Sequence, residues 1–90
     1  MLILNQLGNK VVNVDNVESI EIDYHPGNAY AVVRAITEHD WDNEYDHYAS
    51  IKLGEYSTSV KAEEVIKWIY TAYMSESRGF KMPKDGEVDA

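Results

Sequence analysis

The segment that most constrains the fold is residues 54–74, GEYSTSVKAEEVIKWIYTAYM, which has a clear helical period. From Ala62 onward its apolar residues recur at intervals of three and four, which places them on one stripe of an α-helix. They are Ala62, Val65, Ile66, Ile69, Ala72 and Tyr73. Ser57 is the predicted N-cap because its hydroxyl can accept from free amides of the first turn. A helix with one apolar stripe needs another element to cover it.

The rest of the chain has the patterning of short strands. Strands are predicted at residues 2–7, 10–14, 19–24, 29–37 and 48–53, with residues 80–82 adding to a sheet edge. The predicted fold is therefore of the α+β class, an antiparallel sheet of four to five strands with one long C-terminal helix packed on one face. Residues 1–83 would form this single domain, and residues 84–90 an acidic flexible tail.

The composition limits the classes of partner. The chain has 90 residues, which suits one domain, and its 16 acids and 8 bases give a net charge of −8. Binding to a nucleic-acid backbone or to an anionic membrane needs clustered Lys and Arg, so we expect neither. No stretch approaches the ~20 apolar residues of a membrane span, and the first residues do not resemble a signal peptide. We therefore expect a cytoplasmic protein.

Residues 38–47, EHDWDNEYDH, are the most unusual stretch. They contain five acids, two histidines, a tryptophan and a tyrosine, but no Lys or Arg. The acids would complement a basic partner, and the aromatic rings would supply rigid contact area. We predict a partner-binding segment formed by Glu38, Asp40, Trp41, Asp42, Glu44, Tyr45 and Asp46. The alternative interpretation is a solvated hairpin tip.

Metal and catalytic sites are not indicated. A calcium loop of the EF-hand type beginning at Asp40 would need Gly and Glu at the positions occupied by Tyr45 and Ile51. His39 and His47 match no compact zinc spacing, and the chain has no cysteine. The serines lie in no recognisable nucleophile context, and no Gly-rich phosphate loop is present. We therefore predict no metal, no cofactor and no enzymatic activity.

Two further sets of residues are candidates for binding. Trp68 and Tyr70 flank the apolar stripe, and aromatic residues are enriched in interfaces, so we predict that they form an oligomer interface. A homodimer would also relieve the small core of so short a chain. An anionic nucleotide would instead need bases gathered in one pocket, and Arg34 and Lys52 are the predicted pair. The other bases that could join them are Lys61, Lys67 and Arg78.

Several motifs resemble a group of small uncharacterised proteins carried by phages and prophages of Gram-positive bacteria. They are ILNQ, VNVDNVESIEI, LGEYST, the helical AEEVIKWIYTAY and the final FKMP, and they cover about two-thirds of the chain. The relatives more often have acids where this chain has Ser59 and Val60, and they tend to be shorter between the middle strands. The resemblance implies a phage accessory gene acting by binding, commonly to neutralise a host defence system. It carries no catalytic residues to transfer.

These observations lead to three hypotheses about function. The first is a non-enzymatic inhibitor, anti-CRISPR or similar, that binds a basic host defence protein through residues 38–47, with the acidic surface imitating nucleic acid. The second is an oligomeric sponge that sequesters a nucleotide signalling molecule of a host defence system. The third is a phage structural or regulatory interaction module. All three place the protein in the cytoplasm of the host cell.

Overall fold

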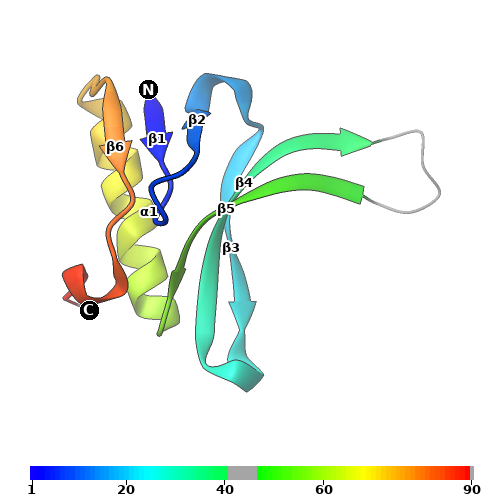
Figure 1. Cartoon of the computed structure of the whole chain (residues 1–90), viewed down its shortest axis with the longest axis vertical. Helices are drawn as coiled ribbons and strands as arrows, with labels where there is room; N and C mark the ends of the chain where they lie inside the picture. The colour runs from blue at the N-terminus through cyan, green and yellow to red at the C-terminus, as the bar shows by residue number, and fades with distance from the viewer. Residues whose placement is uncertain (41–46, 90) are drawn as a thin grey trace.

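The computed structural model describes residues 1–40 and 47–89 and has the expected α+β class (Figure 1). Its strands and helix are β1 (Leu2–Leu4), β2 (Val11–Asn13), β3 (Ser19–His25), β4 (Tyr30–Asp40), β5 (His47–Tyr56), α1 (Ser59–Met74) and β6 (Gly79–Lys81). Three short 3-10 turns are η1 (Val14–Asn16), η2 (Pro26–Asn28) and η3 (Asp85–Glu87).

The strands form two three-stranded sheets, so the prediction of one sheet with four to five strands is wrong. Sheet A has the order β2-β1-β6 and sheet B the order β3-β4-β5. The hairpins expected at Gly8-Asn9 and Pro26-Gly27 are present, and β1–β2, β3–β4 and β4–β5 are antiparallel. In contrast, β6 pairs with β1 in parallel. The sheets meet where the Gln6 backbone N–H donates to the Leu53 carbonyl at 2.7 Å, directly after β1 has ended.

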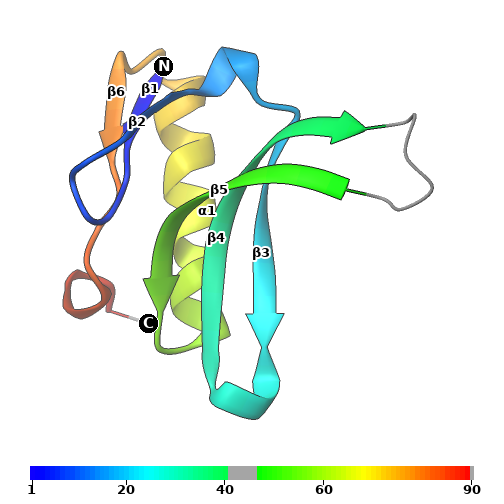
Figure 2. The ribbon, with the colours of Figure 1, turned by 45° about the vertical axis from the view of Figure 1, so that its right-hand side comes forward.

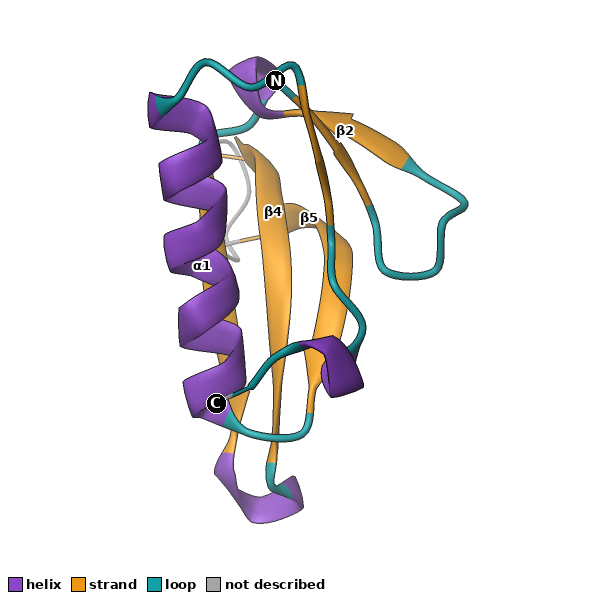
Figure 3. Ribbon diagram, turned by 90° about the vertical axis from the view of Figure 1, so that its left-hand side faces the viewer, coloured by secondary structure: helices purple, strands orange, loops and turns teal. Residues whose placement is uncertain are grey.

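Helix α1 covers one face of sheet B and is shorter than predicted (Figure 3). It has 16 residues and begins at Ser59, because residues 54–56 belong to β5. The N-cap is Thr58 rather than Ser57, and its hydroxyl accepts from the backbone N–H of Lys61 at 3.1 Å. Ala62, Val65 and Ile69 on the predicted stripe are buried.

The core lies between α1 and the two sheets. In β3, Ile20 and Ile22 face the helix while Glu21 and Asp23 face away, as the alternation of the sequence predicts. The largest fully buried side chains are Tyr56, Ile3, Leu53, Met82, Val33 and Val65. They come from β1, β4, β5, α1 and the chain after β6, so one core joins both sheets.

Residues 84–89, expected to be a flexible tail, pack onto the body instead. Val88 is 2% exposed and belongs to the core. The Asp85 carboxylate accepts from the Ser57 N–H at 2.7 Å and lies 3.4 Å from the Lys61 ammonium nitrogen. The buried valine and these polar contacts hold the segment against the start of α1.

Candidate functional site

The β4–β5 hairpin continues past the end of β3 and forms an arm. The last pair between β3 and β4 is Ser19 with Ile36, whereas β4 and β5 remain paired as far as Asp40 and His47. The ribbon shows these two strands leaving the body on the side opposite α1 (Figures 1 and 2). Residues 37–40 and 47–49 are therefore a two-stranded extension without a third strand beside it.

Two irregularities in pairing give the hairpin its curved course. The register shifts between Val33 and Arg34, where Leu53 is the additional residue on β5. It shifts again between Ile36 and Glu38, where the Thr37 hydroxyl donates to the Ala49 carbonyl at 3.0 Å. Such bulges bend a strand and increase its twist. The second of them lies at the base of the arm, where the ribbon bends (Figure 2).

Two members of the predicted partner-binding set lie at the end of this arm. Glu38 and Asp40 are the final positions of β4, in register with Ala49 and His47. The remaining members lie outside the described residues: Trp41, Asp42, Glu44, Tyr45 and Asp46. β4 thus carries the backbone of Glu38 and Asp40 beyond the last pairing with β3.

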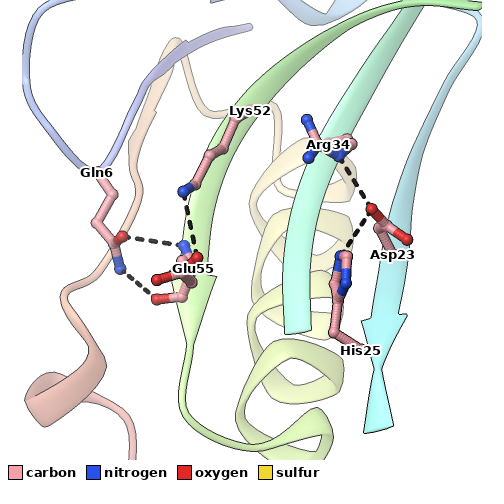
Figure 4. A network of polar contacts seen from close by, with 6 residues as sticks. All are labelled: Gln6, Asp23, His25, Arg34, Lys52 and Glu55. Atoms are coloured by element: carbon pink, nitrogen blue, oxygen red, sulfur yellow. Dashed lines mark hydrogen bonds and ion pairs between the residues drawn. The ribbon is translucent and has the colours of Figure 1, made fainter. Parts of the chain in front are cut away.

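Arg34 and Lys52, the predicted nucleotide-binding pair, lie directly opposite each other in the β4–β5 register (Figure 4). Both occupy the face of sheet B that is turned away from α1. Each of them already lies close to an acid. Arg34 Nε lies 3.4 Å from a carboxylate oxygen of Asp23, and Lys52 Nζ lies 3.3 Å from a carboxylate oxygen of Glu55. The other predicted bases are not gathered there, since Lys61 approaches Asp85 and Lys67 approaches Glu64.

Asp23 is the centre of a polar network that the sequence reasoning missed. Its carboxylate lies 2.9 Å from His25 Nε2 as well as 3.4 Å from Arg34 Nε. The hydrogen bond with His25 is the main cause that lowers the pKa of Asp23, and Arg34 lowers it further against an opposing effect of burial. The His25 ring stacks on Tyr30 with centroids 4.5 Å apart. Only the i, i+2 spacing of Asp23 and His25 on a strand signalled this contact.

A shallow hollow of about 440 Å³ lies at the base of the arm on the same face. Its lining is Glu21, Ile22, Asp23, Arg34, Ile36 and Ser50. Acids and a base share this surface, so an anionic ligand would have to compete with Asp23 for the guanidinium of Arg34. In the described part of the chain, no hydrogen bond joins the His25 imidazole to a serine or threonine hydroxyl.

Trp68 and Tyr70, the predicted oligomer interface, lie on the exposed side of α1. Trp68 is 39% exposed and Tyr70 66% exposed. They are on opposite flanks of the buried stripe, and Tyr70 borders a hollow of about 330 Å³ between α1 and β3. The structure does not bring the two rings into one patch on a single copy.

Three searches bear on the identity of the chain. A scan against protein-family models, a search of curated proteins and a search of solved structures each find no match. Within residues 1–40 and 47–89, no group of three or more potential ligands could hold a metal ion. No helix in that part of the chain has the length and apolar character that a membrane span requires.

Proposed function

We propose that this is a non-enzymatic accessory protein that binds and inhibits a basic protein through its acidic arm. The resemblance to phage proteins makes the partner a component of a host defence system, in the cytoplasm of the host cell. The observation that carries this proposal is the arm itself: β4 and β5 stay paired to Asp40 and His47, beyond the last contact with β3.

The geometry favours contact with a macromolecule. An exposed two-stranded ribbon is only marginally stable, so extending one beyond the sheet costs stability unless a partner covers it. The stretch at its end adds five acids without one base, which concentrates negative charge. A basic groove that normally holds nucleic acid is complementary to this charge, and electrostatic steering would raise the association rate.

Capture of host proteins by variants of the arm tests the proposal. The tagged wild-type protein is used to capture proteins from a host lysate, and the mass of each complex is measured by light scattering. We expect one basic protein in stoichiometric amount, and its loss with the Asp42→Asn/Glu44→Gln variant. The matched control is Glu18→Gln/Glu76→Gln, which removes two exposed acids from the body. Equal capture by both variants would exclude the arm as the contact.

A nucleotide sponge remains the second candidate because Arg34 and Lys52 are opposite each other beside a hollow. Such a protein would release its ligand on denaturation, and mass spectrometry of the released fraction would identify a nucleotide. We expect Arg34→Ala and Lys52→Ala each to weaken binding of that nucleotide. Unchanged binding in both variants would exclude this pair as the nucleotide site. The site is the weaker candidate because the acids Asp23 and Glu55 lie close to the two bases.

A further inference from the structure

Acidic and basic residues are distributed unevenly along the chain. Residues 1–14 and 78–84, which supply all three strands of sheet A, contain no acid. They contain half of the bases of the whole chain: Lys10, Arg78, Lys81 and Lys84. The remaining residues hold all 16 acids and the other four bases. A protein with a net charge of −8 therefore has one locally basic region.

The outer face of sheet A combines one of these bases, Lys81, with exposed apolar side chains. Ile3 and Val12 face the core, so their neighbours Leu2, Leu4 and Val11 face outward. Leu2 is 49% exposed and Val11 57% exposed. Lys81 is in register with Leu4 on the same face. A hollow of about 390 Å³ is lined by Leu2, Leu4, Val11, Gly79, Phe80 and Lys81.

We infer that this outer face of sheet A binds the acidic segment 38–47 of a second copy of the chain. The segment offers what this region lacks: five acids for Lys81 and the other bases of residues 1–14 and 78–84, and a tryptophan and a tyrosine for the leucines. Sheet A and the arm lie at opposite ends of the molecule, so the contact joins different copies (Figures 1 and 2). Such a head-to-tail contact is heterologous and produces a ring or an open chain.

Local attraction outweighs the repulsion between two acidic molecules. At physiological salt the Debye length is about 8 Å, so charges on the two bodies that lie further apart are largely screened. Opposite charges in direct contact still attract each other in water, and burying the exposed leucines adds to this.

The inference rests on the proposed arm, and self-association would compete with capture of a host protein for the same acids. A charge-swap experiment separates the two. One variant carries Lys10→Glu/Lys81→Glu on sheet A, and another carries Asp42→Lys/Glu44→Lys on the arm. The control, Lys52→Glu/Lys67→Glu, has the same net charge as the sheet A variant but leaves both surfaces unchanged. Sedimentation velocity measures the mass of each protein over a range of concentrations, and circular dichroism checks folding.

We expect wild type and control to associate, and each charge-swap variant alone to associate about tenfold more weakly. Mixing the two variants should restore association, because the unchanged arm of the sheet A variant then meets the unchanged sheet A of the arm variant. Monomeric wild type, or association that both variants retain, would overturn the inference. Association lost in Trp68→Ala but kept in both variants would assign the interface to α1. Host-protein capture that survives in the sheet A variant shows that the proposed function stands independently.

Discussion

The side-chain amide of Gln6 pairs with the backbone of Glu55 as one strand pairs with the next. Its Oε1 accepts from the Glu55 N–H at 3.0 Å, and its Nε2 donates to the Glu55 carbonyl at 3.1 Å (Figure 4). The same Nε2 donates to the Pro83 carbonyl at 3.1 Å. A single side chain therefore joins β5 of sheet B to the chain after β6 of sheet A.

Replacing Gln6 should weaken the connection between the sheets. We expect Gln6→Ala to lower the free energy of unfolding by about 1 kcal/mol, the usual net value of a lost hydrogen bond. Gln6→Glu keeps an acceptor but places a negative charge against two carbonyl oxygens. Its loss of stability relative to wild type should therefore be larger at pH 7 than at acidic pH, where the carboxyl is protonated. Urea denaturation measures both values. A Gln6→Glu variant as stable as wild type at pH 7 would contradict this role.

Tyr56 should make stability fall at alkaline pH. Burial raises its pKa above the ordinary value of 10.0, and the charges of Asp85 and Glu87 raise it further. The phenol ionises first in the unfolded chain, so the free energy of unfolding should decrease as the pH rises past about 10. Tyr56→Phe removes the 2.7 Å bond to the Pro83 carbonyl and should cost about 1 kcal/mol at neutral pH.

The alkaline decrease should be smaller in Tyr56→Phe than in wild type. Tyr70→Phe is the matched control, because the Tyr70 side chain is 66% exposed. Denaturation curves at neutral and alkaline pH give the comparison. An identical decrease in all three proteins would assign the effect to other groups.

Asp85 should contribute to stability above acidic pH. The hydrogen bond from the Ser57 backbone lowers the pKa of this carboxyl below 3.8, and Lys61 lowers it further. The stabilisation is present above the pKa of the unfolded chain and is lost as the pH falls through the lower folded value. Asp85→Asn should be less stable at pH 7 and should lose less stability on acidification. The control is Asp89→Asn, at an exposed position of the same segment.

The N-cap of α1 can be tested at two adjacent hydroxyls. Thr58 accepts from the Lys61 N–H at 3.1 Å, so Thr58→Ala should cost about 1 kcal/mol. Ser57→Ala should cost less, because the backbone N–H of residue 57 still donates to Asp85. Thermal or urea unfolding separates the two. A larger loss of stability for Ser57→Ala than for Thr58→Ala would instead identify Ser57 as the N-cap, as the sequence suggested.

Local patterns predicted the local elements. Alternation in residues 19–24 predicted the two faces of β3, and the spacing of Ala62, Val65 and Ile69 predicted the buried stripe of α1. These signals are strong because one side of each element is buried while the other faces solvent. The start of the helix was misplaced because Gly54 resembles a turn residue, although it pairs with Val33 inside β5.

Long-range pairing could not be predicted from the same patterns. The parallel contact of β6 with β1 joins Gly79 to Leu2, and three-residue strands carry too short an alternation to indicate a partner. Val88 is a single apolar residue in an acidic stretch, so its burial depends on the core that distant segments of the chain form together. The arm was only partly predicted because acids are depleted in strands, yet Glu38 and Asp40 continue β4.

The parallel pairing of β6 with β1 also sets the order in which the chain can fold as it is synthesised. Leu2 leaves the ribosome early, but its β6 partner Gly79 is made only after every other strand and the helix. Sheet B needs only contacts between neighbouring segments, so it can form while synthesis continues. The β1–β2 hairpin of sheet A can also form early, but the third strand of that sheet can add only after β6 has been synthesised.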